Sequence, residues 1–387
     1  MIFQRKLLST LRDQIESPEI IVLTGMRRVG KTTLYKTLFD EIPSTNKIFL
    51  DIENPLDQKI FEEVDYNNIW KNLGQKSYVF LDEIQAMPEI VKPIKYLYDH
   101  YHIKFFLTGS SSFYLKNLFP ESLAGRKFIF ELFPLDFAEF LTFKGESHVF
   151  SDSFDAKNKN KNQFSYEKTI KLYDEYLQYG GFPGVVVQDN PTQKELLLND
   201  IFKSYYEKGI KGFSNFRDLT SVRDLILLLL QRTGSRLDIT KLSSELGISR
   251  ETVYSYLSFL EATYFINTIP PFSKNVDREI SGGKKIYLCD TGILNLIGKV
   301  STGHIFENAI FNSIKKYGKI NYYQKRKSEQ EINFIIDQKV SIEVKTKATV
   351  TYLRDLAKLS LNLKIEDYYI VSKEFVNLDR VILATDI

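Results

Sequence analysis

The sequence predicts an α/β protein built around a parallel sheet, and three observations support this fold class. Apolar runs of strand length alternate with segments of helical spacing, at 19–25, 47–53, 77–81 and 104–108. Strand, helix, strand repeating in this order gives a parallel sheet covered by helices on both faces. A glycine-rich loop separates the first strand from the first helix, and two acidic residues end a later strand.

Length and composition set the limits for this fold. The chain has 387 residues, two to three times the usual ~100–200 residues per domain, so two or three cores are expected. Hydrophobic residues make up 43% and charged residues 26%, which is typical of a globular protein. The 52 basic and 49 acidic residues neither favour nor exclude a nucleic-acid partner. The single cysteine, Cys289, excludes an intramolecular disulfide and is expected to be a small buried residue at a strand end.

No signal for a membrane or for secretion stands out. The longest aliphatic run, 225–230, is far short of the ~20 residues that span a bilayer. The N-terminal segment alternates apolar and charged residues and lacks a long apolar stretch before a cleavage site. We therefore expect a cytoplasmic protein with no membrane partner.

The loop at 25–32, GMRRVGKT, matches the phosphate-binding pattern G-x-x-x-x-G-K-[ST]. A β-branched apolar run precedes it, as a buried parallel strand would. After it, Leu34, Leu38 and Ile42 recur at a spacing of four, which is one face of a helix. The loop therefore has the strand and the helix that a phosphate site requires.

In such a site, backbone N–H groups of the loop surround the phosphates. Lys31 would reach the terminal phosphates, and the Thr32 hydroxyl would bind magnesium. The alternative is an ordinary turn with a coincidental lysine, in which Arg27 and Arg28 are solvated charges. The predicted ligands are ATP and Mg²⁺, bound by Gly25, Met26, Arg27, Arg28, Val29, Gly30, Lys31, Thr32 and Thr33.

Polar residues at two further strand ends complete the predicted site, because parallel sheets place their sites at that edge. Asp82 would hold magnesium, directly or through water, and Glu83 would polarise the attacking water. Thr108, at the end of the strand 104–108, would sense the terminal phosphate. The alternative for Thr108 is a turn residue that ends a strand.

The segments GMRRVGKTT, FLDIENP, YVFLDEIQ, FFLTGSSS and LAGRKFIFELFPLDFAEF resemble AAA+ ATPases of bacteria and archaea that carry a helix-turn-helix and a nuclease-like C-terminal domain. The resemblance covers nearly the whole chain and implies an ATPase core over 1–145. It also implies that Arg126 senses or stabilises the phosphate, in its own or in a neighbouring subunit of a ring or dimer. The alternative for Arg126 is a surface arginine that precedes a strand. Residues 133–141 are expected to form an apolar helix packed on the sheet.

Residues 146–235 are expected to form a linker and a helical lid. The Lys- and Asn-rich stretch 145–165 lacks periodicity and predicts a mobile loop. A helix should follow and end at Gly180-Gly181, and the resemblance implies that it begins a lid over the nucleotide.

Residues 236–300 have the layout of a winged helix-turn-helix. A short helix, a turn at Gly247, a second helix capped by Ser249 and an apolar strand follow one another. The second helix of such a module enters the major groove of DNA. Winged helices also serve as lids or protein-docking units, and Arg250 is the one basic residue of this helix. The candidate DNA contacts are Ser249, Arg250, Thr252 and Tyr256.

Residues 301–387 resemble the core of the PD-(D/E)XK nuclease-like superfamily. That chemistry needs an aspartate one strand before Glu-x-Lys, so that two carboxylates hold a metal and the lysine orients water. Glu343 and Lys345 match on one strand face, and Glu307 matches an acid on the preceding helix. The aspartate position holds Asn333, which removes a carboxylate that magnesium prefers. Glu331, two residues away on the same face, is the alternative ligand.

We therefore expect a nuclease-like fold without robust nuclease activity, used for contact with DNA or another subunit, or else a plain surface ion pair. For the whole chain, the first hypothesis is an Mg-ATP hydrolase whose nucleotide state moves C-terminal domains on DNA or on a protein. The alternatives are a nucleotide-gated binding switch with little turnover and an ATP-controlled nuclease.

Overall fold

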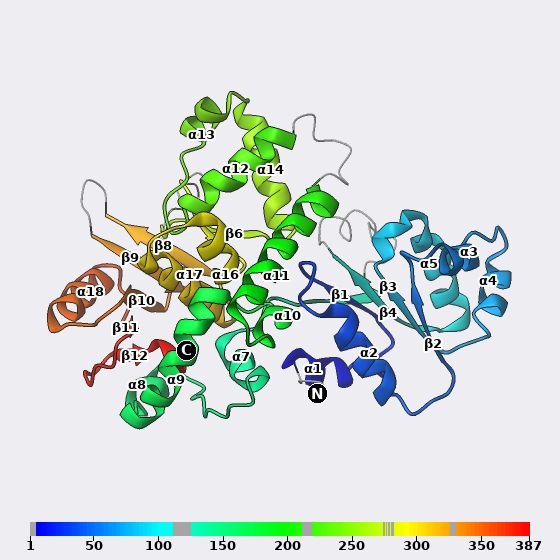
Figure 1. The fold of residues 1–387 in the computed structure, drawn as a ribbon, viewed down its shortest axis with the longest axis horizontal. Helices are drawn as coiled ribbons and strands as arrows, with labels where there is room; N and C mark the ends of the chain where they lie inside the picture. The colour runs from blue at the N-terminus through cyan, green and yellow to red at the C-terminus, as the bar shows by residue number, and fades with distance from the viewer. Residues whose placement is uncertain are drawn as a thin grey trace. The chain divides into compact units, whose positions relative to one another are not determined.

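The computed structural model describes residues 5–110, 125–210, 219–273, 275, 277, 279, 282–325 and 330–387 (Figure 1). The chain divides into two compact units. The first unit is Met1–Phe133 with Ala262–Phe265, and the second unit is Pro134–Glu261 with Ile266–Ile387. In the described part of the chain, no helix has the length and apolar character needed to cross a membrane.

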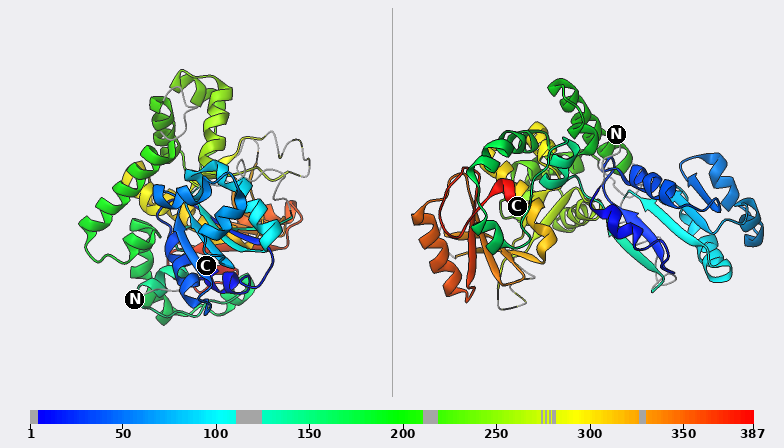
Figure 2. Two further views of the ribbon diagram at one scale, coloured as in Figure 1. Left: turned by 90° about the vertical axis from the view of Figure 1, so that its right-hand side faces the viewer. Right: turned by 90° about the horizontal axis from the view of Figure 1, so that it is seen from below.

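The first unit is built on a five-stranded sheet in the order β2-β3-β4-β1-β5, with every pairing parallel. The α/β fold with a parallel sheet is therefore confirmed. The inner strands are buried because helices cover both faces, and Figure 2 shows this sheet from two further sides. The strands are β1 (Ile20–Thr24), β2 (Lys47–Asp51), β3 (Tyr78–Asp82), β4 (Lys104–Gly109) and β5 (Lys127–Glu131).

The helices of the first unit pack on this sheet through aromatic and aliphatic side chains. On α2, the Tyr35 ring meets the rings of Phe80 and Phe106 edge-on. Two helices lie between β2 and β3, because the Asp65 carboxylate accepts the backbone N–H of Asn67 and caps the start of the second one. The helices are α1 (Leu7–Arg12), α2 (Lys31–Glu41), α3 (Pro55–Phe61), α4 (Tyr66–Asn72) and α5 (Val91–Tyr101).

The second unit ends in a mixed sheet of order β12-β11-β10-β9-β8. Strands β8, β9 and β10 pair antiparallel, and β10, β11 and β12 pair parallel. A helix, three strands, a second helix and two further strands follow one another in this part of the chain. The elements are α17 (Thr302–Ile314), β8 (Ile320–Gln324), β9 (Glu331–Ile336), β10 (Val340–Lys345), α18 (Val350–Asn362), β11 (Asp367–Ser372) and β12 (Val381–Leu383).

The expected pair of helices and its strand are also present in the second unit. Gly247 ends the first of these helices with a φ of 65°, and Asp238 caps its start. The strand after the second helix pairs antiparallel with a later strand, which makes a two-stranded hairpin. The elements are α12 (Leu219–Gln231), α13 (Ile239–Leu246), α14 (Arg250–Ala262), β6 (Ile266–Ile269) and β7 (Lys285–Leu288). Cys289 is buried directly after β7, as expected.

Two expectations for the middle of the chain are wrong. The helix expected on the first sheet, α7 (Phe137–Phe143), lies in the second unit, where its aromatic rings meet those of α9 (Gln163–Tyr179). The stretch expected to be a mobile loop contains the helix α8 (Phe154–Lys159). Its polar residues bind the end of the chain, since the Asn158 amide donates to Asp379 Oδ1 over 2.7 Å. Further α-helices of this unit are α10 (Pro183–Val186), α11 (Pro191–Ser204) and α16 (Thr291–Ile293).

Candidate nucleotide site

The glycine loop leaves β1 and enters α2, and its backbone shape depends on glycine at two positions. Gly25 has a φ of 150°, and a Cβ atom there would lie 2.1 Å from the Leu132 carbonyl oxygen. Gly30 has a φ of 97° and caps the start of α2. The loop therefore presents the N-terminus of α2 at the carboxyl edge of the sheet, as an anion site requires.

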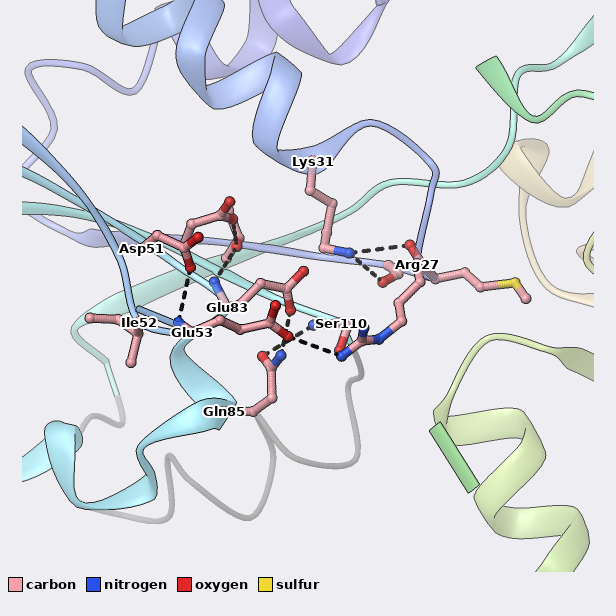
Figure 3. A network of polar contacts seen from close by, with 12 residues as sticks. Arg27, Lys31, Asp51, Ile52, Glu53, Glu83, Gln85 and Ser110 are labelled. Atoms are coloured by element: carbon pink, nitrogen blue, oxygen red, sulfur yellow. Dashed lines mark hydrogen bonds and ion pairs between the residues drawn. The ribbon is translucent and has the colours of Figure 1, made fainter. Parts of the chain in front are cut away.

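Lys31 is buried within this loop. Its Nζ donates to the carbonyl oxygens of Gly25 and Met26 over 3.1 and 3.2 Å. Burial lowers the pKa of Lys31, although Glu83 and Asp82 oppose that effect. Carbonyl oxygens are neutral acceptors, so the ammonium gains most from an anionic phosphate that replaces them. Figure 3 shows Lys31 reaching back across the loop.

Asp82 links the loop to two strand ends. Thr32 Oγ1 donates to Asp82 Oδ2 over 2.7 Å, and Thr108 Oγ1 donates to Asp82 Oδ1. Because β4 lies between β1 and β3, Thr108 stands between the loop and the acid. Burial raises the pKa of Asp82, while hydrogen bonds from Thr108 and Thr32 oppose the shift. Three residues that the sequence predicts for one site, Thr32, Asp82 and Thr108, therefore lie in contact.

Glu83 follows Asp82 in a left-handed conformation, with a φ of 51°. Its backbone N–H donates to Thr108 Oγ1 over 2.9 Å, and its carboxylate accepts a hydrogen bond from the Gln85 amide. Gln85 Oε1 in turn accepts the backbone N–H of Ser110 over 3.3 Å (Figure 3). The sequence analysis missed Gln85, although its place two residues after the acid was the available signal.

The remaining loop positions differ in what they can offer a nucleotide. Met26 and Val29 are buried, so they would contribute backbone N–H groups rather than side chains. Arg27 is not a simple solvated charge, because its guanidinium lies 3.4 Å from Glu53 Oε1 (Figure 3). Arg5, another residue that the sequence analysis missed, donates to the Val29 carbonyl over 2.8 Å and supports the loop from behind.

Arg126 lies at the opposite edge of the sheet. It precedes β5, whose first residue pairs with Ile20 at the start of β1, whereas the loop follows the end of β1. Five residues of strand separate the two edges, which is about 16 Å. Arg126 also pairs with Asp99 over 3.2 Å. A role for Arg126 at the phosphate site of its own subunit is therefore excluded, and the role in a neighbouring subunit stays a prediction.

The residues at Asp82 fit a magnesium ion. A hydroxyl and a carboxylate oxygen converge there, and magnesium takes one or two carboxylates together with phosphate oxygens and water. Across the described residues, no group of three or more His, Cys, Asp or Glu could hold a metal. Phosphate and water would therefore supply the remaining ligands.

The nuclease-like positions of the second unit also meet in space. Asn333 and Glu343 are neighbours across β9 and β10, since the Asn333 N–H donates to Glu343 Oε2 over 3.2 Å. Lys345 Nζ donates to Glu343 Oε1 over 2.7 Å. Burial raises the pKa of Glu343, although Lys345 opposes it. The Asn333 side chain accepts the Val344 N–H over 2.9 Å, which a carboxylate would also do.

A second lysine is bound to the other candidate acids. Lys285, buried on β7, lies 3.1 Å from Glu331 Oε2 and 3.9 Å from Glu307 Oε1. Tyr287 donates to Glu307 Oε1 over 2.7 Å. The ammonium group of Lys285 therefore already pairs with the two acids that would have to bind a metal with Glu343. Lys285 is a residue that the sequence analysis did not consider.

The candidate DNA contacts on α14 are not all at the surface. Ser249 and Arg250 are exposed and Thr252 is half-buried, with Ser249 accepting the Thr252 N–H over 3.1 Å. Tyr256 is buried, with 5% of its surface exposed. The expectation for Tyr256 is therefore wrong, because the helical period turns this residue toward the core.

The strand order of the first unit, with Lys31, Thr32 and Asp82 at one edge, defines a P-loop ATPase core. Residues 17–141 match the model of the AAA domain, and this match supports a core of the AAA type. Residues 170–303 match the model of a domain of unknown function (DUF8612).

Several proteins are similar to this chain over much of its length. An uncharacterized protein of Methanocaldococcus jannaschii is 27% identical over 90% of this chain and 82% of that protein. An uncharacterized protein of Haemophilus influenzae is 27% identical over 82% of this chain and 80% of that protein. Among solved structures, the Walker-type ATPase of Pyrococcus abyssi is 18% identical, with a TM-score of 0.43, over 76% of this chain and 96% of that chain.

Proposed function

We propose that the chain binds ATP with Mg²⁺ and hydrolyses it. The observation that carries this proposal is the convergence of Lys31, Thr32 and Asp82 at the N-terminus of α2, with Glu83 directly beside them. The buried ammonium of Lys31 meets neutral carbonyl oxygens at a helix N-terminus, so an anionic phosphate there would gain a charge-assisted hydrogen bond.

Each residue has a role that its position supports. Backbone N–H groups of the loop and Lys31 would bind the phosphates, and Thr32 and Asp82 would hold the magnesium ion. The bound ion would neutralise charge that develops on the phosphate oxygens. Glu83 would accept a proton from the attacking water, and Thr108 would report the presence of the terminal phosphate to Asp82 and Glu83.

Phosphate release from Mg-ATP tests this function. Wild type is expected to turn over, and Lys31→Ala is expected to lose both binding of a fluorescent ATP analogue and turnover. Lys36→Ala is the matched control, because Lys36 lies on the same helix but outside the loop. If Lys31→Ala and wild type release phosphate at equal rates, the loop does not bind the reacting nucleotide.

Coupling to DNA or to a protein is the finer part of the proposal. The hairpin of β6 and β7 and the exposed Ser249 and Arg250 support a winged helix that touches DNA. Duplex DNA is then expected to raise the rate of phosphate release, and Arg250→Ala to reduce that stimulation and leave the basal rate unchanged. If wild type releases phosphate at the same rate with and without DNA, the proposed basal ATPase activity stands but DNA is not its partner.

A nucleotide-gated switch with little turnover is the second candidate, and the contact between Gln85 and Glu83 favours it. A carboxylate that already accepts a hydrogen bond from Gln85 is less available to the attacking water. If this contact keeps the Glu83 carboxylate from the water, Gln85→Met is expected to raise the rate of phosphate release severalfold. In Gln85→Glu the new carboxylate would repel that of Glu83 and change the rate for this different reason. A rate in Gln85→Met equal to that of wild type would remove this reason for the switch.

Nuclease activity has little support. Glu307 and Glu331 share the ammonium of Lys285, and Asn333 provides no carboxylate. We therefore expect no metal-dependent cleavage of linear or circular DNA. Cleavage by wild type that Glu343→Ala abolishes would contradict this expectation.

A further inference from the structure

Strand β5 presents apolar side chains at the edge of the first sheet. It is the last strand of that sheet in the described part of the chain. Phe128 and Ile129 point to opposite faces, yet 42% and 43% of their surfaces are exposed. Edge strands usually carry charges or irregularities that prevent pairing with another chain. Here the centre of the strand is apolar on both faces.

The outer edge of β5 offers backbone groups in a regular pattern. The Ile20 N–H donates to the Arg126 carbonyl over 2.8 Å, and the Leu132 N–H donates to the Thr24 carbonyl over 2.7 Å. Even-numbered residues of this segment therefore bond to β1. Because bonding alternates along a strand, Lys127, Ile129 and Glu131 direct their backbone groups outward.

The sequence of β5, KFIFE, is complementary to itself when two copies run antiparallel. With Ile129 opposite Ile129, Lys127 of one strand faces Glu131 of the other. Phe128 then faces Phe130 on the other side of the sheet. Opposite charges and aromatic pairs placed across two strands stabilise the pairing, whereas a parallel arrangement in the same register would place like charges side by side.

We propose that β5 is the interface of a homodimer, in which a second copy of this chain adds its β5 antiparallel about a two-fold axis at Ile129. Such an interface is isologous, because each copy offers the same surface. It would join two five-stranded sheets into one and bury Phe128 and Ile129. The Tyr264 hydroxyl donates to Glu131 Oε1 over 3.0 Å, and a carboxylate accepts several hydrogen bonds, so that contact is compatible with the pairing.

The proposed pairing would place Arg126 near the nucleotide loop of the partner, a consequence that rests on the proposed function. In its own subunit Arg126 lies at the amino edge of the sheet. In the antiparallel pair it faces the partner's Leu132, whose carbonyl packs against the partner's Gly25. Arg126 thus comes to the loop edge of the partner's sheet, about 10 Å from the partner's β1. The dimer itself needs no nucleotide, so its test is independent of ATP chemistry.

Charge reversal tests the proposal by sedimentation equilibrium of the full chain without nucleotide. Wild type is expected to show a monomer–dimer equilibrium. Lys127→Glu and Glu131→Lys each create two like-charge pairs across the two-fold axis and should weaken the dimer about tenfold or more. The double variant restores both pairs and should dimerise like wild type. A mixture of the two single variants should form heterodimers.

Controls separate this interface from other effects of charge. Lys71→Glu and Glu63→Lys reverse exposed charges elsewhere in the first unit and should leave the dimer unchanged. Tyr264→Phe removes the hydrogen bond to Glu131 without changing its charge and should also dimerise. Thermal unfolding by circular dichroism shows whether each variant is folded. A wild type that stays monomeric to about 100 µM, or a dimer that neither single reversal weakens, would overturn the proposal.

Discussion

Asp82 is the residue at which stability and function oppose each other. Burial raises its pKa, so the folded protein binds a proton at Asp82 more tightly than the unfolded chain does. Stability therefore falls as pH rises from the ordinary aspartate pKa through the raised one, and at neutral pH the ionised group is a net cost. A magnesium ion that binds the ionised carboxylate would offset this cost.

Asp82→Asn is therefore expected to stabilise the nucleotide-free protein at pH 7. The raised pKa of Asp82 sets the direction of this effect, so a rise in Tm is expected. The gain should shrink as the pH falls toward the ordinary aspartate pKa, where both side chains are neutral. Thermal unfolding of both proteins between pH 5 and 8 measures this difference.

The control is Asp40→Asn, an exposed position on α2, which should change Tm by little at any pH. The account fails for Asp82 if the variant is less stable than wild type at pH 7. That result would mean that hydrogen bonds from Thr32 and Thr108 to the carboxylate outweigh the cost of its burial.

At the scale of single residues, the sequence predicts those site residues that belong to one linear motif or to the end of a strand. Lys31, Thr32 and Asp82 could be found because the loop and the strand fix their positions. Arg5 could not be found, because its contact depends on the return of the N-terminal segment to the loop, and hydrogen-bond partners distant in sequence leave no periodic signal. Gln85 lies two residues after the acid, so its position was visible, but the direction of its side chain after the strand was not.

At the scale of elements, the loop between β1 and α2 is held by its contact with Leu132. The carbonyl oxygen of Leu132 lies so close to the Gly25 Cα that residue 25 has no room for a side chain. The end of β5 therefore shapes the nucleotide site although it contributes no ligand. A sequence motif contains the glycine but not the neighbour that requires it.

Gly25→Ala is expected to distort the loop. The new Cβ would lie 2.1 Å from the Leu132 oxygen at an unfavourable φ, so we expect a loss of about 2–4 kcal/mol in stability. Binding of the ATP analogue should fall at least tenfold. Equilibrium urea unfolding and a binding titration measure the two effects.

Gly184→Ala on α10 is the matched control, because no atom lies within 4 Å of the added Cβ. It should be neutral or slightly stabilising, since alanine favours a helix. If Gly25→Ala binds the ATP analogue as wild type does, the backbone at Gly25 does not shape the site.

The prediction of helices and loops from composition fails where polar residues are buried and hydrogen-bonded inside the protein. The stretch 145–165 has the composition of a loop, yet Lys157 and Asn158 are buried and bind the end of the chain. Polar groups near a strand end can stay buried when each has a partner. Composition alone cannot distinguish such a helix from a solvated segment.

At the scale of the whole molecule, the chain consists of two compact units, and the nucleotide residues lie in the first. The second unit has its own core, in which α18 packs against β9, β11 and β12. The alternation of apolar runs with helices predicted the parallel sheet of the first unit, but it did not predict the order of the strands in either sheet. The assignment of α7 to the second unit could not be predicted either, because an apolar helix gives no sign of which sheet it covers.

Nucleotide is expected to stabilise the first unit selectively. Ligand at about 100 times its Kd contributes about 2.7 kcal/mol to the unit that binds it. Hydrogen exchange with Mg-ADP should therefore slow in β1, β3 and α2 and stay unchanged in β9 and β10. Lys31→Ala should abolish this protection.

Equal protection of both units in wild type would show that nucleotide binding is transmitted through the whole chain. Protection confined to the second unit would contradict the site. Protection of the first unit that persists in Lys31→Ala would show that nucleotide binds elsewhere in that unit.

The central claim is that Glu83 acts on the water that attacks ATP bound at Lys31. The most direct test is the initial rate of phosphate release from saturating Mg-ATP by wild type and by Glu83→Gln, which keeps the size of the side chain but is not a base. We predict that Glu83→Gln binds the ATP analogue with unchanged affinity and releases phosphate at least about 100-fold more slowly. Equal rates would contradict the account, because the water would then be activated by another group.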